Sequence, residues 1–294
     1  MAIRPFEARD APALARLAQA CAGGERDFVL NPLWESEGEL FAEFERFGIE
    51  PERHVRVAAE GDAVLGLAGF LRRPGDALAG LLCPIVAPEA RGRGLGGALL
   101  RAALELAVRE LGIAFAAAAL GTRNRAGYSL LASHGFRPTR QHFLLRCETR
   151  PDPGGSPLAD LACRAAKPSD ADAILALYTA CGFEPRSPEV MRAALCDGRH
   201  DFALARQGDR AVAFCELEIH WPRRVWVAFV GVESGLRERG LGSHLLAWAL
   251  ARRFDAGAAS ALLLLSPANR AALRSYEKVG FRRHRVIDVL ERRL

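Results

Sequence analysis

The apolar positions of this chain fall into two runs of the same kind, one in each half. Each run is a β-like apolar stretch, then a short polar turn rich in glycine, then a stretch with apolar residues at helical spacing. The helical stretches are residues 97–107 and 243–251. A strand, a tight loop and a helix are therefore predicted twice.

The turns share one composite motif. Both spell Arg-x-x-Gly-x-Gly, an Asn follows about one supersecondary unit later, and a Gly-Phe pair stands 11 residues beyond that Asn. The copies are residues 91–96, Asn124 and Gly135-Phe136, and residues 237–242, Asn269 and Gly280-Phe281. A motif repeated in this order indicates an internal duplication.

The beginnings of the two halves also match. Residues 3–14 align without gaps on 163–174 as a short strand leading into a helix, and residues 149–157 between them are rich in Pro and Gly. We therefore expect an N-terminal domain over 1–148, a linker over 149–160 and a C-terminal domain over 161–294. The first half has about fourteen more residues before its loop, which we place around 31–53. The apolar residues there (Leu40, Phe41, Phe44 and Phe47) are expected to pack in the core or at a domain interface, with a substrate lid as the alternative.

The glycine-rich loops are suited to an anion. Glycine lets the backbone approach a ligand closely, and the first turn of the following helix directs unpaired N–H groups at it. Arginines at 91, 93, 237 and 239 add positive charge. Neither loop has the Gly-Lys-Ser/Thr of a P-loop, and neither is a Gly-x-Gly-x-x-Gly loop with an acidic residue at the end of the next strand, as a dinucleotide site requires. A diphosphate group is the predicted ligand.

The full pattern, Val86-x-Pro88-x-x-Arg91-x-x-Gly94-x-Gly96-x-x-Leu99-Leu100 with the later Asn and Gly-Phe, resembles the acyl-CoA signature of the GNAT-type N-acetyltransferase superfamily. The second half resembles it again. The resemblance implies two tandem α/β domains, each with a mixed, mostly antiparallel sheet whose two central strands splay apart, and acetyl-CoA as the co-substrate. It implies that CoA lies against Pro84, Ile85, Val86, Arg91, Gly92, Arg93, Gly94, Leu95, Gly96 and Asn124, and against Val230, Gly231, Val232, Arg237, Glu238, Arg239, Gly240, Leu241, Gly242 and Asn269.

The halves differ where the resemblance implies chemistry. In the family, a Tyr seven residues beyond the Asn protonates the departing CoA thiolate, a general-acid role that needs a hydroxyl. Tyr276 stands at that place in the second half, whereas the first half has Leu131. Tyr128 lies about one helical turn from the matching position and is expected to be a packing residue. The N-terminal domain is therefore expected to be catalytically degenerate.

The general base remains open. Many family members use a Glu on the strand before the loop, but the aligned positions are Leu82 and Ala228. On the preceding strand, alternation places Glu216, Glu218 and His220 on one face, where each could act directly or through water. The alternative is that these side chains cover the solvent-facing side of an edge strand.

Composition narrows the setting. Seven scattered cysteines without a Cys-x-x-Cys pair indicate buried, reduced thiols and no metal site. No apolar run reaches membrane-spanning length and the N-terminus has no signal-peptide core, so we expect a cytoplasmic protein. The net charge of +5 lies in the second half, and steering of anionic CoA explains it more simply than nucleic-acid binding.

We therefore expect a tandem N-acetyltransferase that moves an acetyl group from acetyl-CoA to a primary amine of a small molecule or peptide. The chain would be a monomer with an internal pseudo-dimer, or a homodimer. Mycothiol synthase has a similar tandem arrangement with an active second domain, but nothing in the sequence identifies its thiol-sugar substrate. The alternative is a non-catalytic acyl-CoA-binding or interaction protein.

Overall fold

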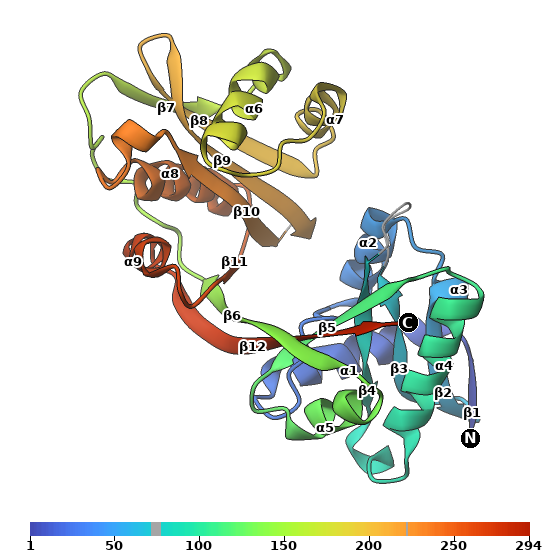
Figure 1. The fold of residues 1–294 in the computed structure, drawn as a ribbon. Helices are drawn as coiled ribbons and strands as arrows, with labels where there is room; N and C mark the ends of the chain where they lie inside the picture. Colours follow the sequence, from blue (N-terminus) through green and yellow to red (C-terminus); the bar gives the residue numbers. More distant parts are fainter. Residues whose placement is uncertain (72–77, 222) are drawn as a thin grey trace. The chain divides into compact units, whose positions relative to one another are not determined.

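The computed structural model describes residues 1–71, 78–221 and 223–294. The chain forms two compact units (Figure 1). Unit 1 contains Met1–His142 together with Arg285–Leu294, and unit 2 contains Phe143–His284. Both units have a mixed α/β fold, in agreement with the predicted class.

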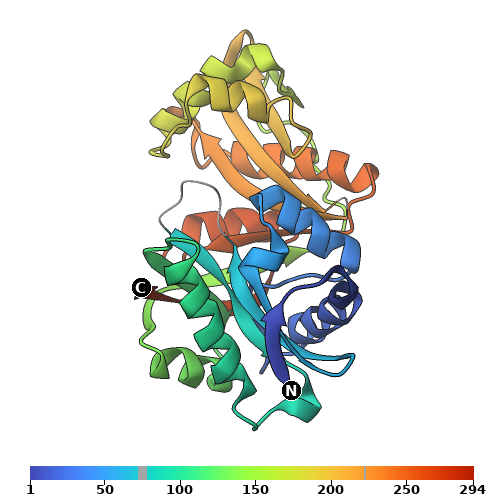
Figure 2. The same ribbon diagram turned by 90° about the vertical axis from the view of Figure 1, so that its right-hand side faces the viewer.

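Unit 1 has a sheet in the order β1-β2-β3-β4-β5-β12-β6. From β1 to β12 in this order, neighbours are antiparallel except for the parallel pair β4 and β5. Its strands are β1 (Ala2–Pro5), β2 (Val55–Glu60), β3 (Ala63–Leu71), β4 (Leu78–Val86) and β5 (Phe115–Gly121), with parts of β6 (Arg137–Cys147) and β12 (Arg282–Arg293). Its helices are α1 (Ala11–Gly23), α2 (Glu37–Phe47), α3 (Pro51–His54), α4 (Leu95–Arg109) and α5 (Arg125–Ser133). Figure 2 shows α4 on one side of strands β2 to β4 and α1 on the other.

Unit 2 repeats this plan in the order β7-β8-β9-β10-β11-β6, with β10 and β11 as the parallel pair. Its strands are β7 (Leu161–Ala165), β8 (His200–Gln207), β9 (Arg210–Trp221), β10 (Arg224–Val232) and β11 (Ser260–Leu265). Its helices are α6 (Ala171–Ala180), α7 (Pro188–Ala194), α8 (Leu241–Asp255) and α9 (Arg270–Val279).

The last strand of each half contributes residues to the sheet of the other half. Residues 287–293 of β12 pair with β5 in unit 1, and residues 143–147 of β6 pair with β11 in unit 2. The compact units therefore differ from the expected division into 1–148 and 161–294. The reason is that alternation along a strand predicts which side chains are buried, but not which sheet accepts the strand.

Both parallel pairs splay, as the resemblance implies. Strand β4 pairs with β5 only over 78–80, opposite 115–117, and β10 pairs with β11 only over 224–226, opposite 260–262. Beyond these residues no ladder joins the two strands in the described chain. Each unit therefore has a V-shaped opening that starts at its parallel pair.

Alternate residues of the strands pack on opposite faces. In unit 2, Phe202 and Leu204 join a core cluster with α6 and α7, whereas Ala203 and Ala205 join another with α8. In unit 1, Leu40 and Phe44 of α2 are buried in the core, which confirms the packing role expected of them. Phe41 is 39% exposed, and Tyr128 packs against the core as predicted.

The two amino-terminal strands keep the same ion pair. Arg4 donates two hydrogen bonds of 2.7 Å to Asp10, and Arg164 donates two of 2.7 Å to Asp170. Each Asp also accepts from the backbone N–H three residues earlier. The duplication predicted from residues 3–14 and 163–174 is thus preserved in side-chain geometry.

All seven cysteines are free thiols, but only Cys21, Cys83, Cys147 and Cys215 are buried, and Cys196 is exposed. The expectation of buried thiols holds for those four alone. Among the described residues, no helix combines the length and the apolar character needed to cross a bilayer.

Candidate active site

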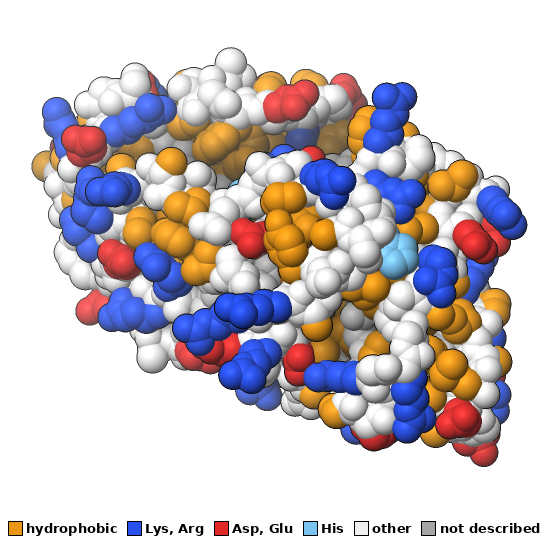
Figure 3. All heavy atoms as spheres, turned by 60° about the horizontal axis from the view of Figure 1, so that its bottom comes forward, with side chains coloured by type: hydrophobic (Ala, Val, Ile, Leu, Met, Phe, Trp, Pro, Cys, Tyr) orange, Lys and Arg blue, Asp and Glu red, His pale blue; other side chains and the backbone are white. Residues whose placement is uncertain are grey.

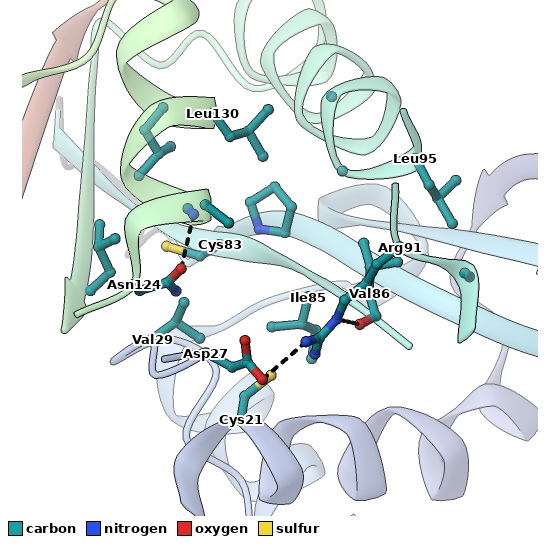
Figure 4. A pocket seen from close by; sticks show the side chains of 18 of the residues that line it. Cys21, Asp27, Val29, Cys83, Ile85, Val86, Arg91, Leu95, Asn124 and Leu130 are labelled. Carbon is teal, nitrogen blue, oxygen red and sulfur yellow. Dashed lines mark hydrogen bonds and ion pairs between the residues drawn. The ribbon is translucent and has the colours of Figure 1, made fainter. Parts of the chain in front are cut away.

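Each glycine-rich loop borders a cavity. The cavity of unit 1, of about 300 Å³, is shown in Figure 4, and that of unit 2 is about 570 Å³. Most of the residues predicted for CoA line them: Pro84, Ile85, Val86, Arg91, Gly92, Gly94, Leu95, Gly96 and Asn124 in unit 1, and Val230, Val232, Arg237, Glu238, Gly240, Leu241, Gly242 and Asn269 in unit 2. Arg93, Gly231 and Arg239 are outside these linings.

The first glycine of each Gly-x-Gly sets the turn into the helix. Gly94 has a φ of 77° and Gly240 a φ of 84°, in the left-handed region that side chains with a Cβ disfavour. Neither α4 nor α8 has a side-chain cap at its N-terminus. The opening N–H groups of both helices are therefore directed at the cavity mouth without a side-chain acceptor.

The second glycine lets the helix pack closely. A Cβ at Gly96 would lie 3.3 Å from Leu130 Cδ2, and a Cβ at Gly242 would lie 3.3 Å from Val232 Cγ2. Both contacts are tighter than ordinary van der Waals distance. The two glycines of each loop therefore have different roles: the first forms a left-handed turn, and the second allows the helix to pack closely.

The loop arginines differ between the units. Arg91 Nε donates to the carbonyl of Val86 at 2.9 Å, and Arg237 Nε donates to Val232 at 3.0 Å. Arg91 also forms an ion pair of 3.0 Å with Asp27, drawn as a dashed line in Figure 4. No such acid partner of Arg237 is present among the described residues. The unit 1 site is therefore the less positive of the two.

The two motif asparagines are helix N-caps. Asn124 Oδ1 accepts from Gly127 N at 2.9 Å, and Asn269 Oδ1 accepts from Ala272 N at 3.1 Å. These bonds fix the start of α5 and of α9 beside the cavities. A local capping role was readable from the sequence, since Asn before a helical pattern is a common N-cap.

In unit 1, the segment 28–31 lies inside the splay. Leu30 N donates to Ala119 of β5 at 2.9 Å, and Gly121 N donates to Phe28 at 3.0 Å. On the other strand, Cys83 N donates to Asn31 at 2.9 Å, where β4 has an extra residue relative to β3. The segment thus satisfies backbone groups of both splayed strands. No sequence signal indicated that residues 28–31 lie between the two splayed strands.

The predicted acid lies in unit 2. Tyr276 lines the same cavity as the Gly240 loop, and its ring is in edge contact with Phe281 at 5.7 Å. Burial raises the pKa of Tyr276 to about 12, so its hydroxyl is neutral at physiological pH. In unit 1, Leu131 occupies the corresponding lining position and has no group that can donate a proton.

The predicted carboxylates lie on one face of β9, outside the lining of the loop cavity. Strand β9 is flanked by β8 and β10, so the alternative of an edge strand was wrong. Glu216 is fully buried; Tyr178 donates a hydrogen bond to its Oε2, and Arg186 donates one of 2.6 Å to its Oε1. Neither partner was predicted from the sequence, since they lie 38 and 30 residues away from Glu216 in the chain.

Glu218 has a different environment. Its Oε2 lies 3.1 Å from His220 Nε2, and the His220 ring stacks on Trp226 with centroids 5.4 Å apart. The Glu218 side chain is 16% exposed, whereas that of Glu216 is not exposed. Glu218 is therefore the carboxylate that a molecule from solvent can reach.

One group of potential metal ligands is present among the described residues. His200, Glu216 and Glu218 each offer an atom within 4.8 Å of the others. The Arg186 guanidinium, however, already supplies a positive charge to Glu216. The donor set fits a guanidinium–carboxylate network better than a cation site.

Unit 1 has no counterpart of these carboxylates. Strand β3 of unit 1 corresponds to β9 of unit 2: Gly66 pairs with Val86, and Ala213 pairs with Val232. Counting along both strands from these pairs, Gly69 corresponds to Glu216. Leu71 corresponds to Glu218. A Cβ at Gly69 would lie 2.4 Å from the backbone oxygen of His54. The fold of unit 1 therefore excludes any side chain at that place.

The model of the acetyltransferase (GNAT) family matches residues 19–136 and 171–281, once in each half. The chain belongs to the GNAT acetyltransferase family. It is an acyltransferase built from two copies of the family's domain.

Two relatives match the chain over nearly the whole length of both proteins. The chain is 32% identical over 305 residues to a mycothiol acetyltransferase of Thermobispora bispora, covering 95% of each chain. It is 31% identical to one of Sanguibacter keddieii, covering 95% of this chain and 92% of that one.

Solved structures support the fold. An N-acetyltransferase related to GCN5 from Sphaerobacter thermophilus superposes with a TM-score of 0.79 at 21% identity, covering 99% of this chain and 95% of that one. A tandem GNAT protein of the clavulanic acid pathway gives 0.73 at 18% identity, covering 99% and 98%. At these identities the likeness concerns the fold alone.

Proposed function

We propose that unit 2 transfers an acetyl group from acetyl-CoA to a primary amine, and that unit 1 binds CoA without turning it over. The observation that carries the proposal is the difference at one position of two similar cavities. Tyr276 lines the cavity of unit 2, and Leu131 lines that of unit 1. Only the first can protonate a leaving thiolate.

In this proposal, the backbone holds most of acetyl-CoA. The loop around Gly240 and the N-terminus of α8 receive the diphosphate, since opening N–H groups and glycine backbone suit an anion. The pantetheine arm extends along Val230 to Val232, where β10 has separated from β11 and its backbone lacks that neighbour. The thioester then lies in the splay.

Glu218, paired with His220, accepts the proton of the incoming ammonium group directly or through a water molecule. The free amine attacks the thioester carbonyl carbon, and N–H groups of β10 near Val230 stabilise the oxyanion. Glu216 acts as a positioning residue, because its oxygens accept hydrogen bonds from Tyr178 and Arg186. Its burial makes it a poorer acceptor for a proton from solvent.

Collapse of the tetrahedral intermediate breaks the carbon–sulfur bond. The sulfur leaves as a thiolate, and Tyr276 donates its proton to give the CoA thiol. The nitrogen, which became cationic when the amine attacked, loses its extra proton, and this proton passes through water to the Tyr276 oxygen and restores the hydroxyl. Because burial keeps the hydroxyl protonated, the acid is in its required form before each turnover. The products are an N-acetylated amine and free CoA.

The proposed acceptor is a small-molecule or peptide amine. The relatives named mycothiol acetyltransferase cover nearly the whole chain, so the amine precursor of mycothiol is included among the candidates. On the face drawn in Figure 3, Lys and Arg side chains are interspersed with acidic and neutral ones rather than gathered in a stripe. That distribution does not resemble the basic footprint of a nucleic-acid-binding surface.

The test is a turnover screen that measures release of the CoA thiol from acetyl-CoA. Polyamines, amino acids, aminoglycosides, peptide N-termini and the mycothiol precursor are supplied in turn. An amine that supports turnover in the natural chain but not in Tyr276→Phe supports the proposal. If CoA binds but no amine in such a panel is acetylated, the alternative of a non-catalytic acyl-CoA-binding protein is favoured.

A further inference from the structure

The cations around the two cavities differ, and helix α9 is the source of the difference. Arg274 and Lys278 line the cavity of unit 2 together with Arg237. They are four residues apart and therefore lie on one face of the helix. Among the described residues that line the unit 1 cavity, Arg91 is the only cation, and it is paired with Asp27.

The motif asparagines align the two helices residue by residue. With Asn124 matched to Asn269, Ser129 stands in place of Arg274, and Ser133 stands in place of Lys278. Neither serine lines the unit 1 cavity. The α9 cations are thus a feature of the second site alone and not of the duplicated plan.

Arg274 and Lys278 are exposed, and neither forms an ion pair or side-chain hydrogen bond with any residue that the structure describes. Glu238 is the only acid among the described residues that line this cavity. Three cations against one carboxylate leave the rim of this cavity positive. Glycine backbone, a helix N-terminus and Arg237 are sufficient for a diphosphate, so the α9 cations are available to another anionic group.

We propose that Arg274 and Lys278 bind the 3′-phosphate of CoA, so that unit 2 selects 3′-phosphorylated CoA whereas unit 1 does not. The proposal rests on the proposed function, in which unit 2 binds acetyl-CoA. It identifies a specificity determinant: the diphosphate is held by elements common to both units, and the third phosphate by residues of unit 2 only. Exposed charge pairs of this kind weaken as salt is added.

The experiment is calorimetric titration of the full chain with CoA and with 3′-dephospho-CoA. In the natural chain, one site should bind CoA at least about tenfold more tightly than dephospho-CoA, a difference of about 1.4 kcal/mol. The double variant Arg274→Gln, Lys278→Gln should lose that preference while its affinity for dephospho-CoA stays unchanged. The ratio of the two affinities in the natural chain should also decrease as the salt concentration is raised.

Arg270→Gln is the matched control, since Arg270 is exposed on the same helix but outside the cavity lining. It should keep the preference, and melting curves should show all variants folded. Equal binding of both ligands by the natural chain, or a preference that survives in the double variant, would overturn the inference and leave the acetyltransferase proposal standing. Failure of the chain to bind either ligand would instead overturn the proposed function, and the inference with it.

Discussion

The backbone carbonyl of Asn31 accepts a hydrogen bond of 2.9 Å from the N–H of Cys83, inside the opening between β4 and β5. In a working acetyltransferase site, N–H groups on this strand are needed for the carbonyl oxygen of the thioester. Here the donor is already engaged, and the next residue, Pro84, has no N–H to offer. The described positions of unit 1 that match the proposed oxyanion donor, acid and base of unit 2 are therefore Pro84, Leu131 and Leu71.

Restoring the acid alone should therefore not activate unit 1. We expect Leu131→Tyr, introduced into a Tyr276→Phe background, to show no more turnover than Tyr276→Phe by itself. Thiol release from acetyl-CoA with an identified acceptor is the measurement. Recovery of activity in the double variant would contradict the assignment of all chemistry to unit 2.

Tyr276→Phe should reduce the turnover number by about ten- to a thousandfold with little change in acetyl-CoA affinity, because it keeps the ring and its contact with Phe281 but removes the acid. Tyr128→Phe is the matched control, since Tyr128 packs against the core of unit 1. It should leave turnover unchanged. A wild-type rate in Tyr276→Phe would mean that water or another group is the acid.

The pH dependence of the turnover number should reflect the raised pKa of the buried Tyr276. The Tyr276 hydroxyl loses its proton only as the pH approaches its pKa of about 12, because burial raises this pKa. An exposed tyrosine ionises near pH 10. The turnover number should therefore show no alkaline decline from this residue between about pH 8 and pH 10. A decline in that range that disappears in Tyr276→Phe would show that the hydroxyl ionises earlier than its burial implies.

Substitution of the two carboxylates of β9 should affect different properties, namely turnover for Glu218 and stability for Glu216. Glu218→Gln should lower the turnover number by about a hundredfold or more while the melting temperature stays near that of the natural chain. Glu216→Gln should lower the melting temperature, because the Arg186 guanidinium then loses its anionic partner. If Glu216→Gln were as stable as the natural chain but inactive, Glu216 rather than Glu218 would be the base.

Removing residues 285–294 should destabilise unit 1 rather than unit 2. These residues supply the strand that pairs with β5 over 115–121, so their loss leaves an open sheet edge. Hydrogen exchange should rise at 115–121 and change little at 261–265, where β11 is paired with β6. Adding a peptide of residues 285–294 should reduce exchange at β5 again. Equal loss of protection in both strands would argue against this placement of β12.

The exchange of terminal strands also bears on how the halves can be studied. A fragment that ends near residue 142 lacks a strand of its own sheet, so absence of CoA binding by such a fragment would say nothing about the site in the full chain. Variants of the full chain are the better test of each unit.

The sequence by itself determined the local elements and their repetition. Helical spacing predicted α4 and α8, glycines at 94 and 240 marked the left-handed turns before them, and the resemblance carried by the motif implied the splayed pairs that the structure contains. These features depend on neighbouring residues, or on a spacing that the chain itself displays. They are readable because backbone preference and periodicity act over a few residues.

The tertiary structure alone decided which distant segments meet. In the folded chain, Cys83 is hydrogen-bonded to Asn31, and Glu216 is hydrogen-bonded to Tyr178 and Arg186. A Cβ at Gly69 has no space beside His54, and β12 pairs within the sheet of unit 1. Each of these contacts joins residues well separated in the chain. The alternation of apolar and polar residues along one strand is compatible with pairing to several other strands. Only the packing of the whole unit selects the strand with which it pairs.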